Sequence, residues 1–322
     1  MDDDDRERFA VGLRHACMHR SGAALDLGLH ELGWNEALAE DRRTAVSLLF
    51  EVRGETGAGA PPLGAVLGAA LGVTIPPGAG FVLPPLGGDR TPGEGAGGGL
   101  AVRGVGAGSL VDSTTALVVT RTGDVDRVAA VATSELTFRP VHGMDPDLGL
   151  VEVAGDGVPI AAPGGRDLDP GAWPAATALA RLAVAHELVG GARAMLALAC
   201  DHARQRIQFG RPISAFQAVR HRLAETLVAI EAADAALDSA WRDGSAQSAA
   251  IAKAVAGRSA GTTARHCQQV LAGIGFTTEH SLHRHVRRTL VLDQLFGAAR
   301  TLTDDLGAEV LATRRLPALP LL

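Results

Sequence analysis

The sequence contains no tyrosine and only one lysine, Lys253, so nearly all of its basic side chains are arginines. Cysteine is also scarce, because only Cys17, Cys200 and Cys267 are present, an odd number scattered along the chain. Small secreted domains carry paired cysteines in a disulfide framework, whereas a reducing cytoplasm keeps thiols free. The cysteine usage therefore predicts a cytoplasmic protein without disulfide bonds.

Excess positive charge and long uncharged runs are missing as well. The formal net charge is -6, which argues against a nucleic-acid partner or an anionic membrane surface. The chain starts with Met1 and four aspartates, whereas a secretory signal starts with basic residues, so no signal peptide is expected. Residues 182–198 form the richest apolar stretch, but charged residues interrupt it before the ~18 uncharged residues typical of a membrane span.

The chain does contain enough apolar residues for packed cores. Of its 322 residues, 47% are hydrophobic and 20% are charged, which is typical of a globular protein. Residues 1–75 show helical periodicity and are predicted to form a short N-terminal helical domain. Residues 76–165, rich in Gly, Pro and β-branched residues, are predicted to form a reduced β domain. Residues 166–322 return to helical periodicity, which predicts a C-terminal four-helix bundle and an α+β multidomain fold.

Capping residues and turns predict several boundaries in the first two regions. Asp26 or Asp41 can cap the first turn of an N-terminal helix. Residues 122–124, Thr-Gly-Asp, lie between two β-branched runs and predict a hairpin turn. Residues 149–160 read as the last strand of the β domain.

The C-terminal region predicts long antiparallel helices. The first, over about residues 174–205, is apolar nearly all round, so we expect neighbouring helices and another subunit to cover it. The second carries apolar residues that step by three and four along one face: Phe216, Val219, Leu223, Leu227, Ile230, Ala233, Leu237 and Trp241. We expect a third helix to stop at Gly273, Thr277 or Thr278 to cap a fourth, and a last helix over residues 300–313.

Three weaker patterns have ordinary structural explanations. Gly104-x-Gly106-x-Gly108 lies between predicted strands, whereas a dinucleotide-binding loop needs a helix after it, so these are predicted to be turn glycines. Two groups of potential metal ligands lie at helical spacing: His15, Cys17 and His19, and His280, His283 and Arg284. Metal binding needs three or four converging ligands, and neither group has an acidic or further cysteine partner, so no metal site is predicted.

Glu187 lies within the most apolar helical stretch. A carboxylate buried there would have a raised pKa and could serve as a general base. The alternative is an ion pair between helices, with Arg193 or another arginine of the bundle. The sequence leaves both possibilities open.

The stretch RIQFGRPISAFQ, residues 206–217, lies between two predicted helices. Pro212 cannot continue the first helix but suits the start of the next, so a turn between helices is expected here. Such a turn requires neither Arg206 nor Gln217. Planar guanidinium and amide donors at these positions are well suited to a pyrophosphate and to the edge of an adenine.

A second stretch lies about 60 residues further on, and the two together resemble the acyl-CoA dehydrogenase flavoprotein family. That family has Arg-x-x-Phe-Gly followed by Phe-Gln or His-Gln, and then Gln-x-x-Gly-Gly-x-Gly-Phe-x-x-Glu. Here the first motif is Arg206 to Gly210 with Phe216-Gln217, and the second is QVLAGIGFTTE, residues 269–279. Ala272 replaces the first glycine of the second motif. The resemblance covers about residues 174–300, and the helix–β–helix order also agrees with the family's fold.

The resemblance implies an FAD-dependent oxidation of the Cα–Cβ bond of an acyl-CoA. In the family, a carboxylate removes the α proton and the flavin accepts hydride from the β carbon. The residues implied to contact the FAD pyrophosphate and adenosine are Arg206, Gln208, Phe209, Gln217, Gln269 and Gly273. In the family these bundle residues largely serve a flavin seated on a neighbouring subunit, so the resemblance also implies an oligomer.

The chain departs from the family at the catalytic base and at the flavin seat. One family position for the base is occupied here by Phe296, directly before Gly297, and the other by Ala180, beside Arg181. The segment that holds the isoalloxazine in the family is replaced by FVLPPLGGDRTPGEGAG, residues 81–97. Neither Phe nor Ala can accept a proton, so no catalytic residue is predicted in this chain.

The departures favour a base-lacking subunit of a heteromeric acyl-CoA dehydrogenase, similar to those that act on steroid side chains in actinobacteria. In such an enzyme a second subunit carries the base and the flavin seat, and this chain supplies bundle contacts. One alternative is a self-sufficient homomer with a relocated base, Glu187 or Asp293. Another is a structural pseudoenzyme that binds no flavin. The sequence does not identify the acyl group.

Overall fold

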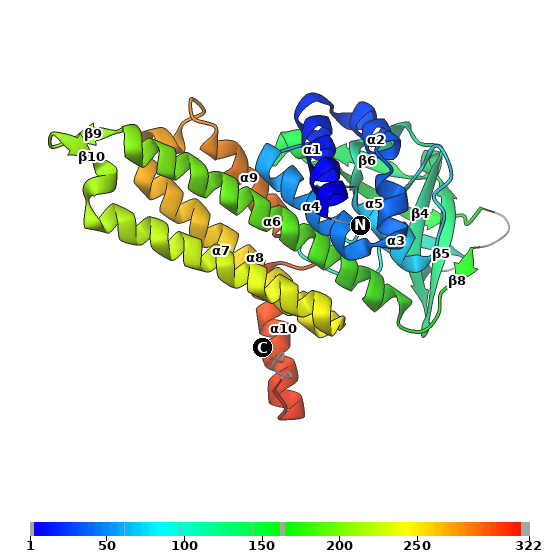
Figure 1. Ribbon diagram of the computed structural model, residues 1–322. Coiled ribbons are helices and arrows are strands. Elements are labelled where there is room, and N and C mark those ends of the chain that lie inside the picture. The colour runs from blue at the N-terminus through cyan, green and yellow to red at the C-terminus, as the bar shows by residue number, and fades with distance from the viewer. Residues whose placement is uncertain (1–2, 61, 97, 144, 162–164, 317–322) are drawn as a thin grey trace.

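The structure is a computed structural model that describes all residues except 1–2, 61, 97, 144, 162–164 and 317–322. Helices at the N-terminus lead into a β-sheet, and the chain then returns to long helices (Figure 1). The long helices lie side by side at one end of the molecule and the sheet lies at the other. This order confirms the α+β class predicted from the sequence.

The N-terminal helices pack around one central helix. Their bounds are α1 Asp3–His19, α2 Gly22–Glu31, α3 Trp34–Glu40, α4 Arg42–Thr56 and α5 Leu63–Leu71. Asp41 caps α4 as predicted, because its Oδ1 accepts a hydrogen bond from the Thr44 amide at 3.1 Å, whereas Asp26 lies inside α2 and caps nothing. Along α4, Val46, Leu49 and Phe50 are fully buried, so this helix connects the N-terminal helices to the bundle.

The middle region forms a mixed sheet with the strand order β6-β7-β3-β2-β4-β5-β8, and β1 pairs with β4 in parallel. The strands are β1 Ala79–Phe81, β2 Gly93–Ala96, β3 Gly99–Ala107, β4 Thr115–Thr122, β5 Val125–Ala132, β6 Thr137–Pro140, β7 Leu150–Val158 and β8 Arg166–Asp167. β4 and β5 form the predicted hairpin, with Gly123 in a left-handed conformation at the turn. β7 agrees with the predicted last long strand.

The prediction that Gly104 and Gly106 are turn residues is wrong, because both lie inside β3. A Cβ at Gly104 would lie 2.2 Å from the carbonyl oxygen of Leu83, and one at Gly106 would lie 2.7 Å from Leu110. Glycine is required there because other parts of the chain approach the strand closely. A short 3-10 turn at Gly108–Asp112 follows the strand, so the surroundings are not those of a dinucleotide-binding loop.

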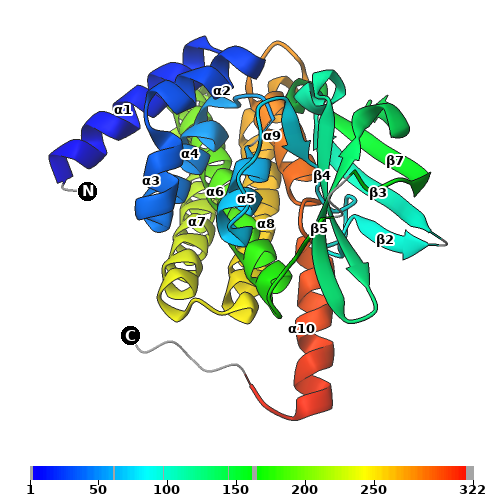
Figure 2. The ribbon, with the colours of Figure 1, turned by 90° about the vertical axis from the view of Figure 1, so that its right-hand side faces the viewer.

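The C-terminal region is a bundle of long antiparallel helices (Figure 2). Its helices are α6 Ala172–Gln205, α7 Gln217–Asp243, α8 Ala246–Leu271, α9 Leu282–Leu292 and α10 Ala299–Thr313. The predicted stripe on α7 holds, with Ile230, Ala233 and Leu237 buried, although Leu227 is 48% exposed. Beyond its first turns, α10 extends away from the body of the protein (Figures 1 and 2).

The apolar surface of α6 is covered within the chain. Every residue from 176 to 192 is buried, because α4, α5, α7, α8 and α9 all pack against this helix. By length and composition α6 could cross a membrane, but 72% of its most apolar window is buried inside the protein, as in the core helix of a folded domain. The expectation that one face of α6 meets another subunit is therefore wrong for residues 176–192.

Two predicted helix ends are also wrong. α8 ends at Leu271, and the residue that takes positive φ is Ala272, with φ 53° and ψ -136°, while Gly273 does not. Thr277 and Thr278 precede the next helix but do not cap it, because the N-cap of α9 is Ser281. A 3-10 turn over Ala272–Phe276 separates the two helices and moves the boundary downstream.

Candidate functional site

The residues implied to contact FAD lie at the end of the bundle that is farthest from the sheet (Figure 1). α6 and α8 both end there, and α7 begins there. Near this end α7 and α8 are joined by a 3.0 Å hydrogen bond between Thr226 Oγ1 and His266 Nδ1. The fold thus brings two motifs about 60 residues apart in sequence to one end of the bundle, which we call the bundle end.

The first motif forms a small hairpin at this end. β9 Ile207–Gln208 pairs with β10 Arg211–Pro212, so the loop between them contains only Phe209 and Gly210. Both loop residues have positive φ, 52° and 76°, as a type I′ turn requires. This conformation is unfavourable for a phenylalanine, yet the Phe209 side chain points into solvent and is 91% exposed.

Aromatic and cationic contacts stiffen the base of the hairpin. The Phe209 and Phe216 rings meet edge to face with centroids 6.0 Å apart. The guanidinium of Arg211 lies 4.5 Å from the centre of the Phe216 ring, within cation–π range. Arg211 was not among the residues implied by the resemblance, although its position between Gly210 and Pro212 places it in the same turn.

The polar side chains of the bundle end are exposed and lack partners. Among the described residues, no side-chain hydrogen bond or ion pair involves Arg206, Gln208, Gln217 or Gln269, and all four are solvent-exposed. Gly273 is exposed as well, and a Cβ there would meet nothing within 4 Å. The structure brings the six implied residues to one exposed end of the protein, where donors remain available to an external group.

Large apolar side chains are exposed in the same two motifs and further along α7. Ile207 is 54% exposed, Phe276 69% and Ile274 38%, in addition to Phe209. On α7, Leu227 and Val228 are 48% and 68% exposed. An exposed group of large apolar residues next to unpartnered polar ones is typical of a surface that another molecule covers.

The two positions where the family carries its base are closed in this chain. Ala180 on α6 is fully buried, and Phe296, between α9 and α10, is 1% exposed with φ 56°. Arg181 donates from Nε to the Phe296 carbonyl at 3.1 Å and from Nη2 to Asp89 at 2.6 Å. Desolvation lowers the pKa of Arg181, although Asp89 opposes the shift.

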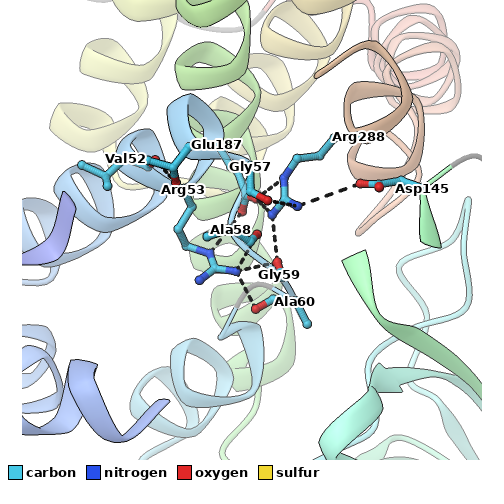
Figure 3. Close-up of polar contacts among 10 residues, drawn as sticks. Val52, Arg53, Gly57, Ala58, Gly59, Ala60, Asp145, Glu187 and Arg288 are labelled. Atoms are coloured by element: carbon cyan, nitrogen blue, oxygen red, sulfur yellow. Dashed lines mark hydrogen bonds and ion pairs between the residues drawn. The ribbon is translucent and has the colours of Figure 1, made fainter. Parts of the chain in front are cut away.

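Glu187 is held in a buried ionic cluster and not in an open site (Figure 3). Its Oε1 accepts from Arg288 Nε at 3.0 Å and also from Nη2 of the same residue. Arg53 Nε lies 3.9 Å from Glu187 Oε2, and Asp145 lies 3.9 Å from Arg288 on the other side. Desolvation by burial lowers the pKa of Arg53 and raises that of Asp145.

The same arginines also bind the loop after α4. Arg53 Nη2 donates to the carbonyls of Ala58, Gly59 and Ala60, and Arg288 Nη2 donates to the Gly59 carbonyl at 2.9 Å (Figure 3). Of the two alternatives for Glu187, the structure supports the ion pair. Its partners are Arg288 and Arg53, whereas Arg193 pairs with Glu51 and Asp234.

Close packing of α4 on α6 leaves little space beside Glu187. A Cβ at Gly54 would lie 2.1 Å from the carbonyl oxygen of Glu187, and one at Gly190 would lie 2.2 Å from that of Glu51. Only glycine permits two helix backbones to approach this closely. The carboxylate of Glu187 is therefore enclosed by helices and arginines, with no exposed surface.

Asp293 has a structural role as well. Its Oδ1 accepts from the Ala299 amide at 3.1 Å and lies 3.6 Å from the ammonium of Lys253. Lys253 is fully buried and donates to the carbonyls of Asp293 and Gly297 at 3.0 and 3.2 Å. Desolvation lowers the pKa of Lys253 to about 8. The only lysine of the chain thus fastens the turn that contains Phe296.

In the segment that replaces the family's isoalloxazine seat, four backbone positions have an amide hydrogen that is missing or already used within the chain. Pro84 and Pro85 have no amide hydrogen. The Leu83 amide donates to Val105, and the Gly87 amide donates to Gln294, at 2.7 and 2.8 Å. These four positions offer no free amide to the polar edge of a flavin ring, whereas guanidinium and amide donors of the kind found at the bundle end are chemically suited to a pyrophosphate and an adenosine.

Comparison with known proteins agrees with this geometry. Residues 174–311 match the family "Acyl-CoA dehydrogenase, C-terminal domain". The bundle is an acyl-CoA dehydrogenase C-terminal domain. Acyl-CoA dehydrogenase IpdE2 of Mycobacterium tuberculosis is 32% identical over 195 residues, which cover 58% of this chain and 58% of the relative. The chain thus matches little more than half the length of that relative.

Solved structures extend the likeness to the whole fold. The ChsE4–ChsE5 complex from Mycobacterium tuberculosis superposes with a TM-score of 0.76 at 19% identity, covering 99% of both chains. A glutaryl-CoA dehydrogenase from Mycobacterium smegmatis, solved in complex with FADH2, has a TM-score of 0.76 at 18% identity and covers 99% of this chain and 97% of its own. The helix–sheet–bundle arrangement of this chain is therefore the acyl-CoA dehydrogenase fold.

Proposed function

We propose that this chain is the base-lacking subunit of an FAD-dependent acyl-CoA dehydrogenase. It contributes pyrophosphate and adenosine contacts from its bundle end to a flavin seated on a partner subunit, which supplies the catalytic Glu. When bound, FAD accepts the hydride that leaves the β carbon of the acyl-CoA. The proposed residues for these contacts are Arg206, Gln208, Phe209, Gln217, Gln269 and Gly273.

One observation carries the proposal. The donors at the bundle end are exposed and without partners among the described residues, while Ala180 and Phe296 close both base positions. The guanidinium of Arg206 is hydrated and lies in the same short stretch as the exposed Gln208 and Gln217, so it is available to pair with an external anion. Abstraction of an α proton needs a carboxylate within hydrogen-bond reach, and none lies at the two closed positions.

The structure disfavours a homomer with a relocated base. Glu187 is fully buried between Arg288 and Arg53, and Asp293 is engaged by Lys253 and the Ala299 amide. Pairing with a buried guanidinium favours the ionised form of a carboxylate but also blocks its access to substrate. Neither side chain lines the cavity between the N-terminal helices and the sheet.

The partner is proposed to cover the bundle end. The ChsE4–ChsE5 complex, which has this fold, contains two different named subunits, and this supports a heteromer. Full exposure of Phe209 and Phe276 in water would be unfavourable, so covering them adds to the affinity of assembly.

In light scattering at micromolar concentration the protein should be a dimer or tetramer, and the double variant Phe209→Ser with Phe276→Ser should weaken this assembly. A monodisperse monomer, with and without a coexpressed second subunit, would contradict this assembly.

Activity provides the direct test. The purified chain should oxidise no acyl-CoA with an artificial electron acceptor, whereas the coexpressed complex should be active. Replacing the partner's catalytic Glu with Gln should reduce turnover by ~10²–10⁴-fold, the usual contribution of a general base. Turnover by the single chain, abolished by Asp293→Asn, would establish the homomeric enzyme instead.

A further inference from the structure

A cavity of about 480 Å³ lies between the N-terminal helices and the sheet. Its described lining residues all lie between positions 21 and 150, so no described part of the bundle contributes to it. It is therefore separate from the bundle end and from the closed base positions. Its volume is within the range of sites that enclose small organic ligands.

The inner wall of the cavity is apolar and firmly packed. Leu25, Trp34, Phe81, Leu110 and Leu148 line it, and each is at most 4% exposed. The Trp34 ring is fixed because its Nε1–H donates to the Ala45 carbonyl at 3.0 Å. Such a wall favours a rigid or chain-like apolar body over a polar one.

Glycines allow the backbone to approach this wall closely. At Gly64 a Cβ would lie 3.5 Å from Phe81, and at Gly80 it would lie 2.9 Å from Leu110. The amide of Gly108 donates to the Gly149 carbonyl at 2.7 Å, which joins two loops of the sheet at the cavity. The backbone around the cavity is thus closely packed.

The polar groups of the cavity lie at its mouth and have one sign of charge. Ser21, Asp26, Asn35 and Asp147 line it and are solvent-exposed. No Arg, Lys or His belongs to the lining among the described residues. Two carboxylates without a basic neighbour in the lining repel an anionic ligand and tolerate a neutral or cationic one.

We propose that this cavity binds a neutral or cationic amphiphile, with its apolar body against Trp34 and Phe81 and its polar head near Asp26 and Asp147. A fatty carboxylate or an acyl-CoA would bring negative charge to the same mouth and is excluded. The site is independent of the proposed flavin contacts, so either proposal can fail without the other.

The test is calorimetric titration of the full chain with compounds of one chain length and three head groups: 1-octanol, octylamine and octanoate. Octanol and octylamine should bind and octanoate should bind at least about tenfold more weakly. From 1-hexanol to 1-octanol the affinity should rise about fourfold per methylene, because each added methylene is buried. Equal binding of octanoate or octanoyl-CoA, or no binding of octanol, would overturn the proposal.

Variants locate the site. Ala65→Phe places a ring into the lining and should weaken octanol binding at least about tenfold, whereas Ala39→Phe, an exposed position outside the lining, should not. Asp26→Asn with Asp147→Asn should raise octanoate affinity about fivefold, and Glu36→Gln outside the lining should leave it unchanged. Unaltered octanol binding by folded Ala65→Phe would refute this location. If that variant does not fold, unchanged octanoate binding by the double Asn variant would refute it.

Discussion

The middle of α6 and the segment that directly follows its last residue contrast sharply although they are continuous in sequence. From residue 176 to 192 every side chain is buried, and the charged ones are paired, as Glu187 is with Arg288. Beyond Gln205 the chain exposes Arg206, Gln208 and Phe209, without polar partners for the first two among the described residues. Residues 176–192 contribute to the packed core. The segment after Gln205 has exposed apolar and polar side chains, which is typical of a binding surface.

Breaking the buried cluster should have the largest effect. Glu187→Gln leaves the buried Arg53 without its ion-pair partner and leaves Arg288 with only Asp145, at 3.9 Å, so the free energy of unfolding should fall by about 3–5 kcal/mol. Denaturant unfolding of the purified chain measures it. As a control, Asp238→Asn removes the exposed ion pair with Arg43 and should cost less than ~1 kcal/mol. Equal effects of the two variants would show that burial at Glu187 carries no special energetic weight.

The pH dependence of Lys253 tests the middle of the bundle in a second way. Its folded-state pKa, about 8, lies below the ordinary lysine value of 10.5 because burial disfavours the charge. Between these values the unfolded chain binds more protons than the folded one, so stability from this site rises as pH increases from about 8 to 10.5. Wild type should gain on the order of 3 kcal/mol over this window relative to Lys253→Met. A stability difference that stays flat from pH 7 to 10 would contradict the buried charged lysine.

At the bundle end the expected effect is on binding and not on folding. Arg206→Ala in the complex should weaken FAD by ~1.5–3 kcal/mol if it removes one charge-assisted contact. The unfolding midpoint of the isolated chain should remain unchanged, because the side chain has no partner in it. Arg220→Ala, an exposed arginine on α7 outside the motif, is the matched control. A loss of stability without a change in FAD affinity would show that Arg206 stabilises the fold and does not contact FAD.

The smallest effect is expected at Ala272. Its φ of 53° and ψ of -136° belong to a region that glycine occupies readily and alanine does not. Ala272→Gly should therefore stabilise the chain by about 1 kcal/mol, although glycine usually destabilises. Thermal unfolding measures the sign, with Ala246→Gly at the start of α8 as a destabilising control. A loss of stability at Ala272 would show that the left-handed turn is not strained.

Periodicity and motifs predicted the fold class and the hairpin, because apolar spacing and turn residues act locally along the chain. The ion-pair partners of Glu187 could not be predicted from local patterns. Arg53 and Arg288 lie 134 and 101 residues away in sequence and contact Glu187 only because α4, α6 and α9 pack together. A structural role for Lys253 could have been suspected from the sequence, because it is the only lysine and lies in an alanine-rich stretch. The full burial of α6 could not be separated from a subunit interface, because both require the same apolar surface.

The resemblance supplied the six proposed contact residues, and the structure adds that they are gathered at one exposed end. Around Phe296, Arg181 and Lys253 hold the turn through hydrogen bonds to its backbone carbonyls. A substitution of Phe296 by Glu would place a carboxylate at a site that is 1% exposed. Restoring a base would therefore require opening the turn as well.

Flavin stoichiometry of this chain, purified alone and then with its partner subunit, tests the central claim most directly. In the segment at residues 81–96 the Leu83 and Gly87 amides are used within the chain, so the chain alone should be colourless or contain far less than one FAD per chain. With the partner it should bind FAD fully and show a flavin absorption spectrum. A yellow protein with one FAD per chain when purified alone would contradict the account.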